Sequence, residues 1–226
     1  SHRPDNLQLF FEYLAKQIDI KQGMNVLDAG CGVGGPLFGI QKVSSNNQFY
    51  GLNISAEQIN LANNKNEQIE SKKIHFNLGD FHNLSEIYDS NFFDRIYFLE
   101  SLVHSNQIDK VIEACHKTLK PYGKLYIKDL YRRVPISKED EKLIEKSVNI
   151  NNDLFKMNID SKENLLVSLR KFGFKLDFCK LLDIEANQNV GNQFVIENGL
   201  VKHESDWHPY LEWYEIRATK VMSHFD

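Results

Sequence analysis

The sequence predicts an α/β fold in which a mostly parallel sheet is flanked by helices. Short apolar runs alternate with stretches of helical periodicity, the order typical of strand–helix–strand units. Phe92–Leu99 is apolar almost throughout, as expected for a strand buried on both faces. A glycine-rich loop directly follows the first predicted strand. A chain of 226 residues can bury one core, so we expect a single domain over residues 1–226.

The first half of the chain contains two strand–helix units after an initial helix. Residues 4–18 carry apolar side chains with the 3.6-residue period of a helix. Asn25–Asp28 is a short strand that enters the glycine loop, and Leu37–Val43 continues as a helix. Gln48–Ile54 is predicted to be the second strand, and Ser55 is suited to cap the helix that follows.

The pattern repeats in the middle of the chain. Ile74–Leu78 is predicted to be a third strand, and Gly79-Asp80-Phe81 follows it. Ile108–Leu119 is a helix closed by Lys-Pro-Tyr-Gly, and Lys124–Lys128 is predicted to be the fifth strand. Alternation of this kind implies that the helices lie on both faces of the sheet.

After the fifth strand the alternation stops. Residues 137–158 are charged, rich in asparagine and weakly periodic, and we expect residues 130–160 to form a lid over the substrate. Residues 161–172 have one apolar face and end at a glycine, which predicts a helix. The last two strands, 175–184 and 214–221, are expected to be antiparallel partners at one edge of the sheet.

Composition restricts the partners. The formal net charge of −4 gives no reason to expect a nucleic acid as a binding partner.

The three cysteines are widely spaced, which favours a reduced, cytoplasmic location. No histidine is placed near Cys31 to activate it as a nucleophile. No apolar run approaches the roughly 20 residues of a membrane span. The sequence is also compatible with one domain of a longer protein, and it has no metal-ligand spacing.

The loop in VLDAGCGVGG carries the strongest functional signal. Gly30, Gly32 and Gly35 match the G-x-G-x-x-G spacing of dinucleotide-binding loops. However, Asp28 ends the preceding strand, where a carboxylate would repel the phosphates of NAD. The same carboxylate suits a ligand with a cationic end and no phosphate. S-adenosylmethionine, with its sulfonium and ammonium groups, is such a ligand.

The segment D-A-G-C-G-x-G-G resembles motif I of the class I S-adenosylmethionine-dependent methyltransferases. The resemblance covers nearly the whole chain. It implies an enzyme with a Rossmann-like, seven-stranded, mostly parallel sheet whose last strand is reversed. It also implies that S-adenosylmethionine is the cofactor and S-adenosylhomocysteine the product. In that family an acid at the position of Asp28 acts on the methionine end of the cofactor, and Gly30 and Gly32 provide the bend that admits it.

Two further segments extend this resemblance. The stretch G-L-N-I-S-A-E-Q is similar to a subgroup that includes cyclopropane fatty acid synthases, tocopherol methyltransferases and natural-product tailoring enzymes. In that subgroup Asn53 and Gln58 would hold the ribose, with Ile54 beside them. Asp80 would bind the adenine amino group and Phe81 would cover the ring. As alternatives, Asn53 and Gln58 could be ordinary cap and surface residues, and Asp80 a turn residue.

The segment ESLVH resembles small-molecule O-methyltransferases of the sugar and tocopherol type. By that resemblance His104 is the general base and Asp129, which ends the fifth strand, supports it. A neighbouring carboxylate raises the basicity of an imidazole and orients it. Glu100 is assigned to the shell around the cofactor. The main prediction is therefore O-methylation of a natural product or another small metabolite.

Two alternatives stay open. The C-terminal W-Y-E-I-R-A-T resembles the last strand of prenyl-diphosphate C-methyltransferases, which carry a Glu-Ser pair where Glu100 and Ser101 stand. That resemblance implies C-methylation of a terpenoid-type substrate, with Glu100 stabilising or deprotonating a carbocation. The second alternative is a non-catalytic module that binds S-adenosylmethionine.

Overall fold

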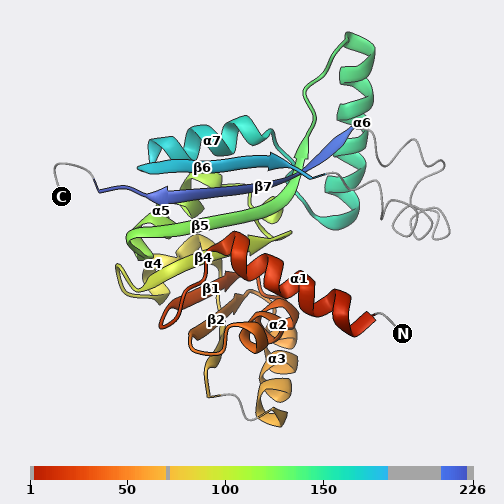
Figure 1. The fold of residues 1–226 in the computed structure, drawn as a ribbon. Helices are drawn as coiled ribbons and strands as arrows, with labels where there is room; N and C mark the ends of the chain where they lie inside the picture. Colours follow the sequence, from red (N-terminus) through yellow and green to blue (C-terminus); the bar gives the residue numbers. More distant parts are fainter. Residues whose placement is uncertain (1–2, 70–71, 183–209, 223–226) are drawn as a thin grey trace.

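A seven-stranded sheet forms the centre of the molecule (Figure 1). The computed structural model describes residues 3–69, 72–182 and 210–222. The strand order is β3-β2-β1-β4-β5-β7-β6. The first five strands in this order are parallel, and β7 is antiparallel to both β5 and β6. The bounds of the strands are β1 Asn25–Ala29, β2 Gln48–Asn53, β3 Ile74–Leu78, β4 Phe93–Leu99, β5 Leu119–Arg132, β6 Phe174–Leu181 and β7 Leu211–Lys220. The predicted fold is confirmed.

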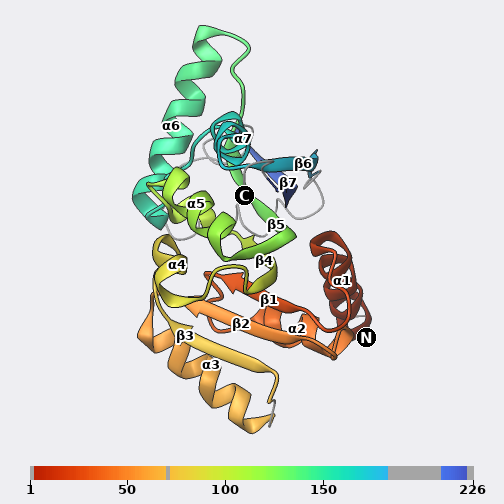
Figure 2. The same cartoon turned by 90° about the vertical axis from the view of Figure 1, so that its left-hand side faces the viewer.

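Helices cover both faces of the sheet (Figure 2). Helices α1, α2 and α3 contribute to the apolar core on one face, and α4, α5 and α7 to the core on the other. Two short 3₁₀ helices, η1 and η2, follow β3 and β4. The bounds are α1 Arg3–Ile18, α2 Gly35–Val43, α3 Ala56–Gln68, η1 Phe81–Asn83, α4 Leu84–Ile87, η2 Leu102–His104, α5 Ile108–Thr118, α6 Lys138–Phe155 and α7 Lys162–Lys171.

Strand β5 is much longer than the sequence predicts. It begins at Leu119, which pairs with Phe93 of β4 before a register shift, so the Lys-Pro-Tyr-Gly segment is an irregularity within the strand. It also continues beyond Asp129 to Arg132, because β7 pairs with it along this whole stretch. Asp129 therefore lies inside the strand, and the expectation that it ends the strand is wrong.

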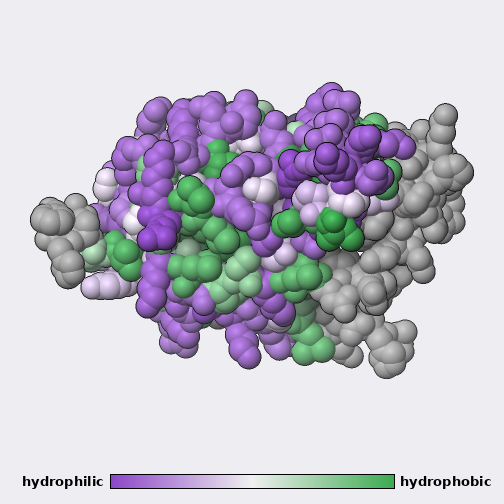
Figure 3. Space-filling model, turned by 90° about the horizontal axis from the view of Figure 1, so that it is seen from above, coloured by the Kyte–Doolittle hydropathy of each residue, from purple (hydrophilic) through white to green (hydrophobic). Residues whose placement is uncertain are grey.

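Helix α6 stands apart from the other helices at the carboxyl end of β5 (Figure 1). It has three acidic residues in its first turn, and Ser137 caps it by accepting a hydrogen bond from the Asp140 amide. The face of the molecule seen from above is mainly hydrophilic, with hydrophobic side chains gathered in its central part (Figure 3). In the ranges described, no helix has both the length and the apolar character needed to cross a bilayer.

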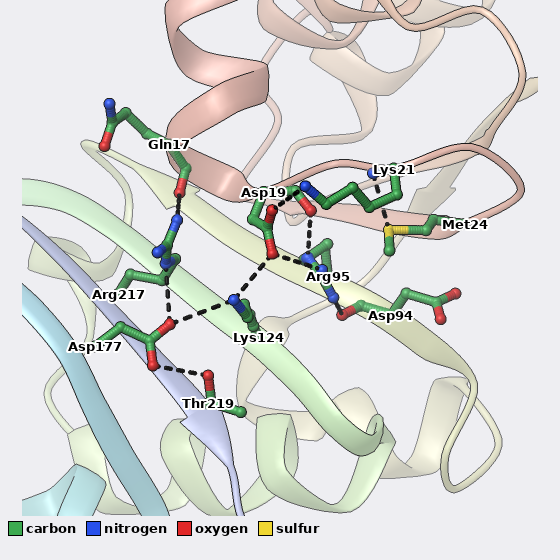
Figure 4. A network of polar contacts seen from close by, with 10 residues as sticks. All are labelled: Gln17, Asp19, Lys21, Met24, Asp94, Arg95, Lys124, Asp177, Arg217 and Thr219. Atoms are coloured by element: carbon green, nitrogen blue, oxygen red, sulfur yellow. Dashed lines mark hydrogen bonds and ion pairs between the residues drawn. The ribbon is translucent and has the colours of Figure 1, made fainter.

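An ion-pair network joins segments at the amino-terminal side of the parallel strands (Figure 4). The carboxylate of Asp19, just after α1, contacts Arg95 of β4 at 3.1 Å and Lys124 of β5 at 2.9 Å. Lys124 also faces Asp177 of β6, which accepts a hydrogen bond from Arg217 of β7 at 3.0 Å. The network thus fixes this side of the sheet and leaves the opposite side, at the carboxyl ends of the strands, for loops that bind ligands.

Candidate functional site

The site lies where the strand order reverses. Strands β1 and β4 are neighbours, but their following helices α2 and α5 pack on opposite faces of the sheet. The loops after these two strands therefore separate, which is the usual position of a nucleotide site in an open α/β sheet. The loop after β1 contains Gly30, Gly32 and Gly34 with φ values of 88°, 54° and 78°. These left-handed conformations are easily adopted only by glycine.

Two of these glycines differ in what surrounds them. A Cβ on Gly30 would lie 2.5 Å from the Cβ of Ser101, so the loops after β1 and β4 touch at this point. A Cβ on Gly32 would have no heavy atom within 4 Å. The loop is therefore packed against Ser101 at Gly30 and has open space beside Gly32. This geometry fits a ligand that approaches the backbone closely.

Three amides of the loop donate to carbonyls of the protein itself. Gly30 and Cys31 both donate to the carbonyl of Leu52, at 2.8 and 3.0 Å, and Gly34 donates to the carbonyl of Cys31. These bonds hold the glycine turn in place after β1.

Asp28 lies beneath the loop on β1. Its side chain is 1% exposed, and its register partner on β4 is Tyr97. Burial raises the pKa of Asp28 to about 7, although the nearby Tyr97 hydroxyl counteracts part of this effect. Oδ2 has no hydrogen-bond partner in the described part of the chain. A buried carboxylate with a free oxygen fits a cofactor whose cationic end lies above it.

The strand ends of β2 and β3 form a pocket of about 140 Å³. It is lined by Asn53, Ile54, Gly79, Asp80, Phe81, His82 and His104. Five of the predicted site residues are thus brought together. Gln58 joins them indirectly: its side chain accepts a hydrogen bond from Asn53 at 2.5 Å, and its amide donates to the Ser55 cap of α3.

Asp80 combines a cap and an open acceptor. Its Oδ1 accepts from the amide of His82 at 2.9 Å and lies 2.6 Å from Nδ1 of the same residue. Burial alone would raise the pKa of Asp80, but these bonds from His82 lower it. Among the described residues Oδ2 receives no hydrogen bond. One residue therefore serves as a turn cap while retaining an oxygen suited to an adenine amino group.

Glu100 follows β4 directly and has an unusual backbone. Its φ is 57°, in the left-handed region that a residue with a side chain rarely adopts. Its carboxylate contacts Nζ of Lys128 at 2.8 Å and is 53% exposed. The same ammonium lies 5.0 Å from the ring centre of Trp213 on β7. Strained backbone of this kind is often found at functional sites.

His104 and Asp129 lie near the same loop but are not hydrogen-bonded to each other. Nδ1 of His104 lies 3.0 Å from the carbonyl of Lys156, just after α6. Because a carbonyl only accepts, Nδ1 carries the proton in this contact, and Nε2, which has no hydrogen-bond partner among the described residues, is left as an acceptor. Asp129, 1% exposed, instead accepts from the amides of Val103 and Leu130 at 3.0 and 2.9 Å. Burial raises its pKa to about 7.

Other candidates add little. Burial raises the pKa of the Cys31 thiol, so a reactive thiolate is disfavoured there. Within the described ranges no group of three or more His, Cys, Asp and Glu side chains is arranged to hold a metal ion. In the C-terminal aromatic segment, residues 206–219, Trp207 and His208 lie outside the described residues, whereas Tyr210, Trp213 and Tyr214 are described.

Sequence reasoning missed three contacting residues. His82 is the partner of Asp80, Lys128 is the partner of Glu100, and Lys156 bonds the His104 ring. The contact of His82 with Asp80 could have been predicted, because the two residues are only two positions apart in the sequence. No local pattern identifies the other two, because they come from segments distant along the chain.

Comparison with known proteins agrees with this geometry. A family described as "Methyltransferase domain" matches residues 20–199. Together the Rossmann-like fold, the glycine loop and the carboxylate beneath it define the class I S-adenosylmethionine-dependent methyltransferases. The chain belongs to this family of methyltransferase domains.

Its curated relatives include sterol 24-C-methyltransferases. The chain is 41% identical over 112 residues to the enzyme erg6 of Aspergillus fumigatus, covering 49% of this chain and 29% of that protein. It is 31% identical over 204 residues to erg6 of Schizosaccharomyces pombe, covering 89% of this chain and 47% of that protein. The chain therefore spans less than half the length of these relatives.

Solved structures share the fold. Geranyl diphosphate C-methyltransferase from Streptomyces coelicolor, in complex with Mg²⁺, geranyl diphosphate and S-adenosyl-L-homocysteine, has a TM-score of 0.79 and 18% identity. The match covers 97% of this chain and 80% of that one. At this identity the likeness concerns the fold alone.

Proposed function

We propose that this domain transfers a methyl group from S-adenosylmethionine to a carbon atom of an isoprenoid-type small molecule. The sterol C-methyltransferase relatives favour this chemistry over the O-methylation that the sequence first suggests. The observation that carries the proposal is Glu100, a half-exposed carboxylate on strained backbone where the strand order reverses. Such a group is positioned to act on a substrate beside the cofactor rather than to support the fold.

The residues of the chain divide the task. Asp28 and the glycine loop would bind the methionine end of the cofactor, Asn53 and Gln58 the ribose, and Asp80 and Phe81 the adenine. When bound, S-adenosylmethionine supplies an activated methyl group on a sulfonium. Methylation of an alkene carbon uses the π electrons for the new C–C bond and leaves a positive charge on the neighbouring carbon. Glu100 would stabilise this charge and accept the proton whose loss restores a double bond.

Lys128 holds Glu100 for this role. The ion pair restrains the orientation of the carboxylate, and a carboxylate can both stabilise a cation and accept a proton. The Trp213 ring beside Lys128 in turn limits the orientations of the ammonium group. We further propose that α6 and the segment around it act as the lid over the substrate. The hydrogen bond from His104 to the Lys156 carbonyl connects that segment to the site.

A second candidate, O-methylation with His104 as base, is favoured by one observation. The bond from Nδ1 leaves Nε2 as the acceptor on a residue that lines the cofactor pocket. Asp129 would then contribute through the backbone of the 102–104 turn instead of contacting the ring.

One pair of variants distinguishes these chemistries. Prenyl diphosphates, sterols and hydroxylated acceptors are first screened with methyl-labelled cofactor. For C-methylation, Glu100→Gln should lower kcat by about 10²–10⁴-fold while changing the dissociation constant of S-adenosylhomocysteine little. His104→Ala should then lower kcat much less than Glu100→Gln does, and exposed Glu86→Gln serves as the matched control. The reverse order of effects would support O-methylation. Binding of the cofactor without transfer to any acceptor would favour a non-catalytic module.

A further inference from the structure

A chain of hydrogen bonds connects the adenine side of the pocket to the loop after β4. Oδ1 of Asp80 lies 2.6 Å from Nδ1 of His82, and Nε2 of His82 lies 2.8 Å from Oγ of Ser105. Ser105 directly follows His104 and ends η2. The chain thus spans two loops that are distant in sequence and lie on either side of the pocket.

The polar groups along this chain favour one tautomer of the His82 ring. The carboxylate of Asp80 can only accept, so Nδ1 of His82 must donate. Oγ of Ser105 already accepts from the amide of Gln107 at 3.1 Å, and its proton needs an acceptor. Nε2 provides that acceptor in the tautomer that carries its proton on Nδ1, so this tautomer satisfies both bonds of the ring.

The ring is also fixed by its surroundings. The His82 side chain is 15% exposed, and Ser105 is 2% exposed. The Phe81 ring lies 4.9 Å from the imidazole, and Phe81 packs edge-on against Phe98 of β4. A partly buried ring with both nitrogens bonded has little freedom, so it transmits the position of one loop to the other.

The geometry points to His82 as a positioning residue that couples adenine binding at Asp80 to the loop carrying Glu100, Ser101 and His104. The inference rests on the proposed function, because it assumes that Asp80 binds the adenine of the cofactor. His82 occupies Oδ1, which directs Oδ2 towards the ligand. Through Ser105 it also fixes η2, the turn that contains His104 and follows Glu100 and Ser101. Ser105 itself is too deeply buried to act as a nucleophile.

Two substitutions separate the two bonds of the ring. His82→Asn places an amide NH₂ where Nδ1 stands, so it retains the bond to Asp80 and loses the bond to Ser105. His82→Ala loses both. We expect His82→Ala to raise the dissociation constant of S-adenosylhomocysteine about 10-fold, and His82→Asn to change it less than about 3-fold. Both variants should lower kcat by about 10-fold. His75→Ala, an exposed histidine on β3, is the control.

Ser105→Ala tests the second bond from its other end. It should lower kcat as His82→Asn does. The double variant His82→Asn/Ser105→Ala should have the same kcat as either single variant, because both substitutions remove the same bond. Additive losses would overturn the coupling, and so would unchanged cofactor affinity in His82→Ala. An ¹⁵N NMR spectrum of the unliganded protein tests the ring directly: a proton on Nε2 of His82 would also overturn it.

Failure of the proposed function is recognised separately. If the wild-type protein does not bind S-adenosylhomocysteine in calorimetry, the cofactor assignment is wrong. If the wild type binds and His82→Ala binds equally well, the cofactor assignment stands and the role of His82 is wrong.

Discussion

Replacing Gly30 by alanine tests how the glycine loop is built. The new Cβ would lie 2.5 Å from Cβ and 2.9 Å from Oγ of Ser101, so the loops after β1 and β4 must separate. An alanine at a φ of 88° also costs about 1–2 kcal/mol. Overpacking typically costs about 1–3 kcal/mol more. Gly30→Ala should therefore lower the free energy of unfolding by about 2–5 kcal/mol, a large part of the stability of an ordinary domain.

Three other glycines provide controls in the same urea-unfolding assay. Gly23 has a φ of 78° with no heavy atom near its Cβ position, so Gly23→Ala should cost only the backbone strain. Gly35, at the start of α2 with equally open surroundings, should tolerate alanine or gain slightly. Gly32→Ala should match Gly23→Ala in stability but, unlike it, weaken binding of S-adenosylhomocysteine. If Gly30→Ala were as stable as Gly23→Ala, the contact with Ser101 would not be part of the fold.

Three further predictions concern pH and the link to α6. Burial raises the pKa of Asp28 to about 7, so the folded protein retains a proton that the unfolded chain has released between about pH 4 and 7. Stability should therefore fall as pH rises through this window, and Asp28→Asn should reduce that fall; identical pH profiles in thermal melts would contradict this. Burial would raise the pKa of Asp19 too, but Lys21 and Lys124 lower it to about 2, so its contribution is present at neutral pH and lost as pH falls towards 2. Asp19→Asn should cost about 2 kcal/mol at pH 7 and almost nothing at pH 2 in urea melts. Asn158→Ala removes a 3.2 Å bond to the His104 carbonyl, and it should speed hydrogen exchange in α6 with little change in melting temperature; unchanged exchange would show that this bond does not anchor the helix.

Much of the fold could be predicted because its signals are local. The glycines, the Ser55 cap and the continuous apolar run of β4 each reflect neighbouring residues. The full length of β5 could not be predicted, since β7, which pairs with it as far as Arg132, is almost eighty residues further along the chain. A strand whose extent depends on a distant partner leaves no clear mark in its own sequence.

The site was predictable to a similar degree. Asn53, Ile54, Asp80, Phe81 and His104 line one pocket, as expected from loops at the same side of a parallel sheet. The pairing of side chains was harder to predict. Two side chains at strand ends can lie close together without a hydrogen bond between them. Backbone amides can donate to a carboxylate that a sequence pattern pairs with an imidazole.

Asp129 is such a case, because its carboxylate bonds to backbone amides and not to the His104 ring. Its carboxylate accepts a hydrogen bond from the Val103 amide, which exists only when the turn after β4 is folded against β5, and a local bond from the adjacent Leu130 amide. A buried acceptor takes the nearest donors that satisfy it. Which donor the carboxylate accepts from can be seen in the structure, but it cannot be deduced from the spacing of residues in the sequence.

The position of β7 has a consequence for how the protein is made. This strand is synthesised after the other six strands of the sheet, yet it lies between β5 and β6. A nascent chain that stops before residue 211 already carries the glycine loop and Glu100, but β5 presents a long unpaired edge of the kind that promotes aggregation. Such a chain also lacks Trp213, which packs on the ammonium that holds Glu100. Chains that lack β7 would therefore be recognisable to cellular quality control by the exposed edge of β5, and the Glu100 carboxylate would not yet be held as it is once β7 has paired.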